Sequence, residues 1–259
     1  MKFHTSIFLA SFAMLVVAAG SQAAEMDKGQ VVRDYTDTVM PENQQAYEAG
    51  IKAYKQCLQE HGFKFKWTAL THETGKVYVY SYVSDPLDWS DFDTIHETAG
   101  VCDSVWMSDV NPHLKKETSA FMVMKPEMSH MPNGANLGTG LIDVTYFTIK
   151  NGHEAHEMFT KMAKMIAHAA TKTNWPGDFQ FAAVQDAGPG APDYVLVWPA
   201  KDWADFGSEI DPSLWKMLEE FYGKKKAGEI RKTLSEVIVH SSSHVDRYNE
   251  DLTYKPSGD

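Results

Sequence analysis

The 259-residue sequence is poor in basic residues, and this scarcity excludes one class of partner. Lysine and arginine total 24 against 35 acidic residues, which gives a formal net charge of −11. A chain this acidic repels phosphate backbones and anionic headgroups, so we expect no nucleic-acid partner. The sequence has no G-x-S-x-G motif, and its glycine-rich residues 134–140 lack the lysine of a phosphate-binding loop.

Long apolar runs are also scarce: the one long run, residues 6–20, follows Lys2 near the N-terminus. Ser21 and Ala23 place small residues at positions −3 and −1 of a signal-peptidase site. The run is short for a bilayer span. We therefore predict a cleavable signal peptide over residues 1–23 and a periplasmic or secreted mature protein with no membrane segment. An uncleaved anchor is the alternative.

The sequence contains an internal repeat. Pro-Leu-Asp-Trp-Ser-Asp-Phe at 86–92 recurs as Ala-Lys-Asp-Trp-Ala-Asp-Phe at 200–206. Each copy follows a strand, a long amphipathic helix and two further strands, and each precedes a helical stretch and a last strand. The predicted strands and long helices are 30–40, 42–61, 63–71, 76–83 and 119–125 in the first half, and 141–149, 152–171, 178–185, 193–198 and 236–245 in the second.

Each half thus reads β-α-β-β-α-β, the ferredoxin-like order. The chain resembles the dimeric α+β barrel superfamily in tandem single-chain form, which includes NIPSNAP-like domains, antibiotic-biosynthesis-monooxygenase-like domains and the haem-binding chlorite dismutases. The resemblance implies an α+β fold whose two antiparallel sheets face each other. The predicted parts are a signal peptide (1–23), a first repeat (24–127), a linker (128–140), a second repeat (141–248) and a C-terminal tail (249–259).

Valines and aromatic residues alternate along residues 76–83 and 193–198. Side chains alternate between the faces of a strand, so we expect the valines to pack under the helices and the rings to lie between the two sheets. A pocket there would bind a small, largely apolar or aromatic molecule. Its predicted ligand-binding residues are Tyr80, Tyr82, Tyr146, Tyr194 and Trp198. The alternatives are that the rings fill a solid core or a homodimer interface.

The repeated Asp-Trp-x-Asp-Phe motif predicts a helix start rather than an acid–base pair. Asp88 and Asp202 each follow a strand, and aspartate is a good helix N-cap. Asp91 and Asp205, three residues on, complete a pattern like a capping box.

The two cysteines, Cys57 and Cys102, both fall on predicted helices of the first half. The helices of a ferredoxin-like unit pack side by side, and an exported chain meets an oxidising compartment. We therefore predict a disulfide, which would stabilise the fold by about 4 kcal/mol in the chain-entropy model. Two free thiols are the alternative.

His240 is the predicted catalytic or ligand-contacting side chain. It follows Val237-Ile238-Val239, which predicts a strand with His240 on the inner face. An imidazole there can act as a general base, a hydrogen-bond donor or a haem ligand. His244 shares that face but lies ~13 Å along the strand, too far for both to hold one ion.

The leading prediction includes no cofactor and leaves open whether the protein is an enzyme. A copper- or haem-binding protein is one alternative, and a non-catalytic interaction or homodimerisation module is another. Thioether and imidazole groups suit Cu(I). The alternative metal ligands are Met128, His130 and Met131.

Overall fold

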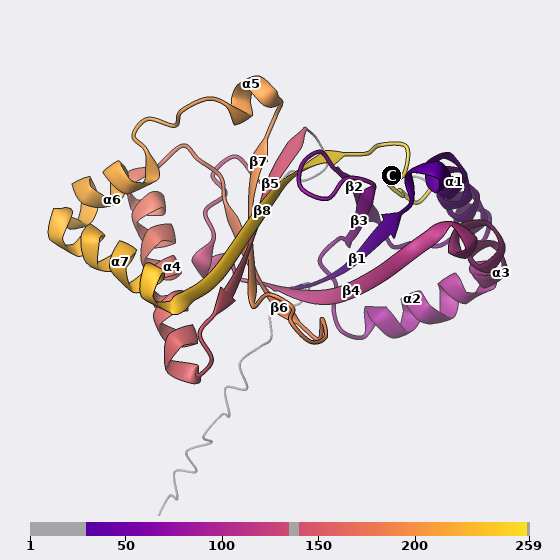
Figure 1. Cartoon of the computed structure of the whole chain (residues 1–259), viewed down its shortest axis with the longest axis horizontal. Helices are drawn as coiled ribbons and strands as arrows, with labels where there is room; N and C mark the ends of the chain where they lie inside the picture. The colour runs from indigo at the N-terminus through magenta and orange to yellow at the C-terminus, as the bar shows by residue number, and fades with distance from the viewer. Residues whose placement is uncertain (1–29, 135–139, 258–259) are drawn as a thin grey trace, which may run out of the picture.

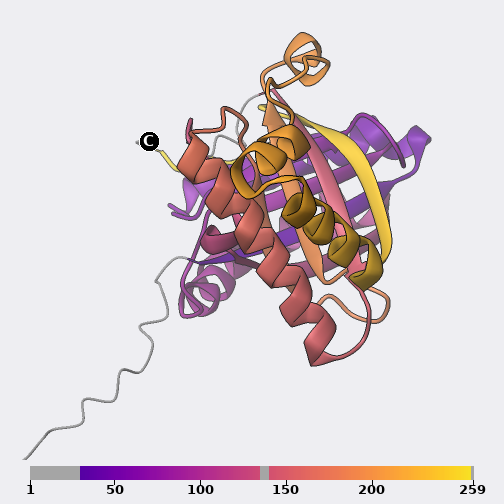
Figure 2. The same cartoon turned by 90° about the vertical axis from the view of Figure 1, so that its left-hand side faces the viewer.

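The computed structural model describes residues 30–134 and 140–257 and forms a closed barrel of eight antiparallel strands (Figure 1). The strand order around the barrel is β1-β3-β2-β8-β5-β7-β6-β4. Helices cover two opposite sides, with α1, α2 and α3 on one side and α4, α6 and α7 on the other (Figures 1 and 2). The predicted signal peptide and residues 135–139 of the predicted linker lie outside the described residues.

The first half supplies four strands and one helical layer. Its long elements are β1 (Val31–Val39), α1 (Gln44–Glu60), β2 (Trp67–His72), β3 (Val79–Ser84), α2 (Asp91–Ala99) and β4 (Leu114–Met124). The short turn α3 (Asp103–Val105) and a π-helical turn (Trp106–Val110) connect α2 to β4, with 3-10 turns on either side. The strand β4 begins five residues earlier than predicted, because the charged segment Lys115-Lys116-Glu117 pairs with β1.

The second half repeats this order. Its elements are β5 (Leu141–Ile149), α4 (His153–Thr173), β6 (Gln180–Gln185), β7 (Tyr194–Ala200), α5 (Trp203–Phe206), α6 (Leu214–Tyr222), α7 (Lys224–Val237) and β8 (Ile238–Tyr248). The sheet orders β4-β1-β3-β2 and β8-β5-β7-β6 are the same in both halves. Pairing of β2 with β8 and of β4 with β6 closes the barrel. The predicted fold, two ferredoxin-like repeats with facing sheets, is confirmed.

The predicted assignment of the strand faces is wrong. Val83, Val195 and Val197 point into the barrel, where they pack with Ile142 and Val144 of β5. The rings lie on the outer faces under the helices. Four predicted pocket residues are therefore on the opposite side of their sheets: Tyr80, Tyr82, Tyr194 and Trp198.

The inversion has a physical cause in the size and polarity of the side chains. A tyrosine hydroxyl needs a hydrogen-bond partner when the ring is buried, and a helix can supply one. Tyr80 donates to Glu48 Oε1 on α1 at 2.7 Å, and Tyr82 reaches the hydroxyl of Tyr47 on the same helix at 2.8 Å. The valines of these strands instead lie between the facing sheets, beside Leu70, Met122 and Tyr146.

Two close contacts hold the helical layer of the first half together. The predicted disulfide is confirmed: Cys57 on α1 is bonded to Cys102 in the turn after α2. Gly50 lets α1 approach the π-helical turn, because a Cβ at this position would lie 2.0 Å from the carbonyl oxygen of Asp109. The predicted buried face of α1 is present, with Tyr47, Ile51 and Leu58 in the core.

The second copy of the motif starts a helix as predicted, with Asp202 as the N-cap of α5. Asp202 accepts a hydrogen bond from the Asp205 backbone N–H at 2.9 Å, and Asp205 accepts one from the Lys201 N–H at 2.8 Å. In the first copy the N-cap of α2 is Ser90, not the predicted Asp88, although Asp91 accepts a hydrogen bond from the Asp88 backbone N–H at 2.9 Å. In the second copy, both aspartate carboxylates thus accept backbone hydrogen bonds at the start of α5.

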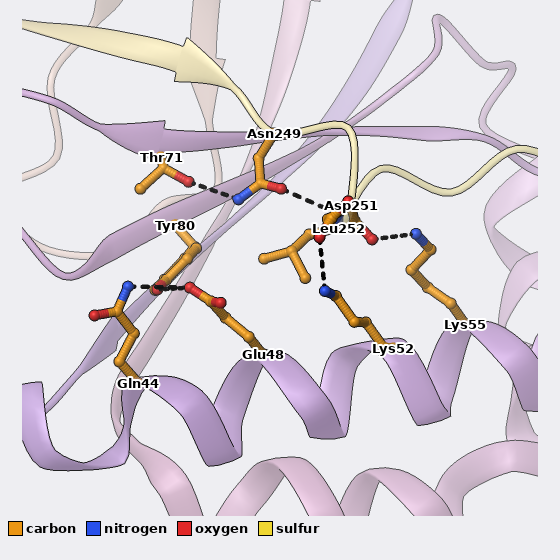
Figure 3. A network of polar contacts seen from close by, with 9 residues as sticks. All are labelled: Gln44, Glu48, Lys52, Lys55, Thr71, Tyr80, Asn249, Asp251 and Leu252. Atoms are coloured by element: carbon orange, nitrogen blue, oxygen red, sulfur yellow. Dashed lines mark hydrogen bonds and ion pairs between the residues drawn. The ribbon is translucent and has the colours of Figure 1, made fainter.

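The C-terminal tail returns to the first half and lies between β2 and α1 (Figure 3). Asn249 donates to Thr71 Oγ1 at 3.1 Å, and Lys52 pairs with Asp251 at 2.7 Å. Leu252 is only 1% exposed and packs in the core under α1. The Tyr254 ring stacks on Trp67 with centroids 4.8 Å apart. The tail follows the second half in sequence but packs on the first half and stabilises it.

Shortening one buried tail residue should destabilise the protein. We expect Leu252→Ala to lower the free energy of unfolding by about 2–5 kcal/mol, because it leaves a cavity in the core. Denaturant unfolding followed by tryptophan fluorescence measures the change. Asp251→Ala is the matched control: its ion pair with Lys52 is exposed, so no measurable loss is expected. Equal losses in the two variants would contradict this account of the tail.

Candidate functional site

A cavity of about 440 Å³ lies inside the barrel, between the two sheets. The sequence-predicted residues Tyr146 and His240 both line it, and His240 is exposed to solvent. Strands of both halves and the β6–β7 loop form its wall. The other lining residues are Asp34, Thr36, Lys116, Thr118, Ser119, Ala120, Met122, Thr148, Val184, Ala187, Pro189, Gly190, Ala191, Pro192 and Ser242.

Two titratable groups with raised pKa values border this cavity: the Asp34 carboxyl and the Tyr146 hydroxyl. Asp34 is 5% exposed, and burial raises its pKa to about 7 although Thr36 donates a hydrogen bond to it. Its Oδ1 atom has no hydrogen-bond partner within the described structure. Burial, assisted by the charges of Asp34 and Asp246, also raises the pKa of the Tyr146 hydroxyl.

A cluster of His72, His244 and Asp246 lies inside the barrel next to Tyr146. The His244 ring is 6.0 Å from the Tyr146 ring and 4.0 Å from the His72 ring. Burial lowers the pKa of His72, against the effects of Asp246 and a backbone hydrogen bond with Lys76. No sequence motif marks this cluster, although alternation along β8 places His240, His244 and Asp246 on one face.

A second cavity, of about 480 Å³, lies between the outer face of the first sheet and its helices. We call it the aromatic cavity, because nine of its lining side chains are aromatic rings. Of the predicted ligand-binding residues it includes Tyr82. The aromatic lining comprises Tyr35, Tyr54, Phe63, Phe65, Trp67, Tyr82, Phe92, Trp106 and Phe121.

Polar side chains on β1 and β4 line part of the aromatic cavity. Asp37 is fully buried and accepts a hydrogen bond from the Tyr47 hydroxyl at 2.6 Å. Because the Tyr47 hydroxyl donates its hydrogen bond to Asp37, its oxygen accepts a hydrogen bond from the Tyr82 hydroxyl at 2.8 Å. Burial, assisted by the neighbouring Glu117 charge and opposed by the Tyr47 hydrogen bond, raises the pKa of Asp37 to about 7. Burial also raises the pKa of Glu117.

Arg33 is the cationic residue of this polar region. Its guanidinium lies over the Phe121 ring at 4.2 Å and donates to Ser119 Oγ at 2.9 Å. Its Nε atom is buried and has no hydrogen-bond partner within the described structure. An unpartnered guanidinium N–H beside a ring-lined cavity can donate to an oxygen atom of a bound molecule.

The remaining sequence-predicted residues do not assemble a site. Tyr194 and Trp198 pack in the solid core under α4. Met128 is also fully buried there, so its sulfur is not available to an incoming ion.

His130, the second of the alternative copper ligands, has both ring nitrogens occupied. Its Nε2 contacts the Trp175 carbonyl oxygen at 2.8 Å and its Nδ1 contacts Thr171 Oγ1 at 3.2 Å. A metal ligand needs a free imidazole nitrogen. The alternative copper site with Met128, His130 and Met131 is therefore not formed.

Comparison with solved structures finds the same fold at very low sequence identity. An anthrone oxidase-like protein matches with a TM-score of 0.56 and 9% identity, over 90% of this chain and 96% of that chain. A mutant chlorite dismutase from Candidatus Nitrospira defluvii matches with a TM-score of 0.52 and 11% identity, over 87% and 95%. No protein-family model matches the chain, and no curated protein does.

These likenesses, with the closed barrel, define the fold. The chain has the dimeric α+β barrel fold, built here from two repeats in one polypeptide. A likeness at this identity establishes the fold and leaves the function to the site. Among the described helices, none combines the length and apolarity that a bilayer span requires.

Replacing Asp37 by asparagine should reduce the pH dependence of stability. An unfolded aspartate has a pKa near 3.9, whereas Asp37 in the folded chain titrates at about 7. Between these values the folded state binds more protons, so the free energy of unfolding falls as the pH rises from about 4 to about 7. Asp37→Asn removes this contribution and keeps an acceptor for Tyr47.

Thermal unfolding midpoints between pH 4 and pH 8 measure this effect. The groups that face Asp37 are Tyr47 from α1, Tyr82 from β3 and Glu117 from β4, with Asp34 on its own strand. All four remain in the variant. Asp85→Asn, on an exposed connection, is the matched control and should keep the wild-type slope. A wild-type slope in Asp37→Asn would refute the assignment.

Proposed function

We propose that the protein binds a small, largely apolar, ring-bearing molecule in the aromatic cavity. The observation that carries this proposal is a cavity of about 480 Å³ whose wall is built from aromatic rings and whose polar region holds Arg33. Ligand sites are typically apolar clefts of 300–1,000 Å³ with a few placed polar groups. The aromatic wall supports the ligand chemistry predicted from the sequence, at a different place in the fold.

The polar region is the part of the cavity where an oxygen atom of the ligand would lie. Arg33 has a free Nε–H, and its ring contacts fix the direction of the guanidinium. Asp37 and Glu117 have raised pKa values and lie beside the same space. A carbonyl, phenolate or carboxylate oxygen next to Arg33 would satisfy the buried donor. If the protein is an enzyme, a carboxyl group that titrates at about 7 is suited to proton transfer.

Binding of aromatic acids and phenols should depend on Arg33. We expect a screen of such compounds to give ligands that raise the unfolding midpoint, and Arg33→Gln to weaken their binding about 10- to 100-fold, the effect of losing one charge-assisted hydrogen bond. His240→Ala, which changes the barrel cavity alone, is the matched control and should bind as the wild type. Loss of binding in His240→Ala with retention in Arg33→Gln would place the ligand between the sheets, as first predicted.

Haem is the alternative ligand, and the donor set admits it. His96 lines the aromatic cavity from α2 and would supply an imidazole nitrogen to the iron, while Arg33 would hold a haem carboxylate. When bound, haem would supply redox chemistry. A haem absorption spectrum of the purified protein that disappears in His96→Ala would favour this alternative over an aromatic metabolite.

We also propose that the protein is exported. The signal-like N-terminus and the disulfide Cys57–Cys102 support this location, because stable disulfides form in oxidising compartments. The mature chain should begin at Ala24, as measured by N-terminal sequencing of protein expressed with its own N-terminus. Ala23→Asp should block cleavage and leave a longer product. An intact Met1 in the wild-type product would contradict the prediction.

A homodimer also stays a prediction, which light scattering at several concentrations tests.

A further inference from the structure

Three side chains with metal-ligating atoms lie inside the barrel, outside both cavity linings. They are His72, His244 and Asp246, and one ligand atom from each lies within 4.8 Å of the others. None of the three lines the barrel cavity or the aromatic cavity. The proposed ligand binding in the aromatic cavity does not involve them.

The ligand atoms converge without forming hydrogen bonds with one another. His72 Nε2 is 3.5 Å and His244 Nε2 is 3.2 Å from Asp246 Oδ1. Neither His244 Nε2 nor Asp246 Oδ1 has a hydrogen-bond partner within the described structure, although Asp246 is only 2% exposed. Buried charges in proteins are paired, hydrogen-bonded or bound to a metal. Both imidazole nitrogens thus lie within ion-pair distance of the same carboxylate oxygen, and the three ligand atoms converge within 4.8 Å of one another.

The backbone holds this arrangement where β2 of the first half pairs with β8 of the second half. His72 ends β2 of the first half and is the register partner of Asp246 on β8 of the second half. His244 lies two residues before Asp246, so both side chains share the inner face of β8. The two imidazole rings stack with their planes 20° apart. Side chains of both repeats are therefore needed to complete the cluster.

We propose that His72, His244 and Asp246 bind one divalent transition-metal cation, of the Zn²⁺ or Fe²⁺ class. Two imidazole nitrogens and one carboxylate oxygen form the donor set of many catalytic zinc sites and of non-haem iron sites. This set leaves coordination positions for water or a substrate atom. The site does not depend on ligand binding in the aromatic cavity.

Zn²⁺ titration of the untagged, EDTA-treated chain tests the proposal by calorimetry, with the visible absorption of Co²⁺ as a second readout. We expect one Zn²⁺ per chain and binding weakened by more than about 100-fold in His72→Gln, His244→Gln and Asp246→Asn, because direct ligands matter at least as much as their supporting residues. Zn²⁺ should also raise the wild-type unfolding midpoint, since it would join β2 to β8 in the folded state.

A double variant, His153→Gln with His156→Gln, is the matched control. It removes two histidines from the first turn of α4 and should bind Zn²⁺ as the wild type does. Absence of wild-type binding, binding that survives all three ligand substitutions, or loss of binding in the control would overturn the proposal. If the substituted chains do not fold, imidazole NMR of the wild type decides the question. Zn²⁺ must then perturb His72 and His244, and perturbation confined to other histidines refutes the site.

Discussion

Strand pairing between the two repeats is the constraint on which the rest of the structure depends. Each four-stranded sheet alone would expose two edges with unpaired backbone groups, and such edges favour aggregation. Pairing of β2 with β8 and of β4 with β6 leaves no free edge and turns the inner faces toward each other. The β2–β8 register spans only three residue pairs. The tail continues this contact beyond β8, through the bridge between Trp67 and Tyr254 and through the buried Leu252.

Closure divides the side chains into two environments with different chemistry. Between the sheets, compact residues such as Val144 and Val195 pack beside buried polar groups, including Asp34 and Asp246. Under the helices, large rings find both apolar contacts and hydroxyl partners. The acid groups inside the barrel and the ring-lined cavity outside it are therefore physically separate, and each can bind a different kind of ligand.

The sequence allowed the fold to be predicted because its signals are local or repeated. The alternation along β7, the apolar stripe of α1 and the helix start at Asp202 each follow from a few neighbouring residues. Face assignment failed because alternation shows that Tyr80 and Val79 are on opposite faces without showing which face meets a helix. That decision depends on the width of the space on each side, which is a tertiary property.

The candidate sites were predictable only in part for the same reason. Strand periodicity predicts His240 on the inner face of β8, where it lines the barrel cavity together with Tyr146. The aromatic cavity combines Arg33, Trp106 and Phe121 from three distant segments, and no spacing rule connects them. His72 and Asp246 are 174 residues apart in sequence, and only the pairing of β2 with β8 brings them together. Contacts that arise from barrel closure cannot be derived from either half alone.

The two repeats differ most in how the space under their helices is filled. In the second half, Phe159, Phe181 and Trp175 form one continuous buried core. In the first half, part of the equivalent space is the aromatic cavity, and empty space costs packing energy. The same half also holds the disulfide, worth about 4 kcal/mol in the chain-entropy model, and receives the C-terminal tail. Additional stabilisation thus lies where the packing is least complete. This distribution is expected if the second repeat serves as the scaffold and the cavity of the first is retained for a ligand.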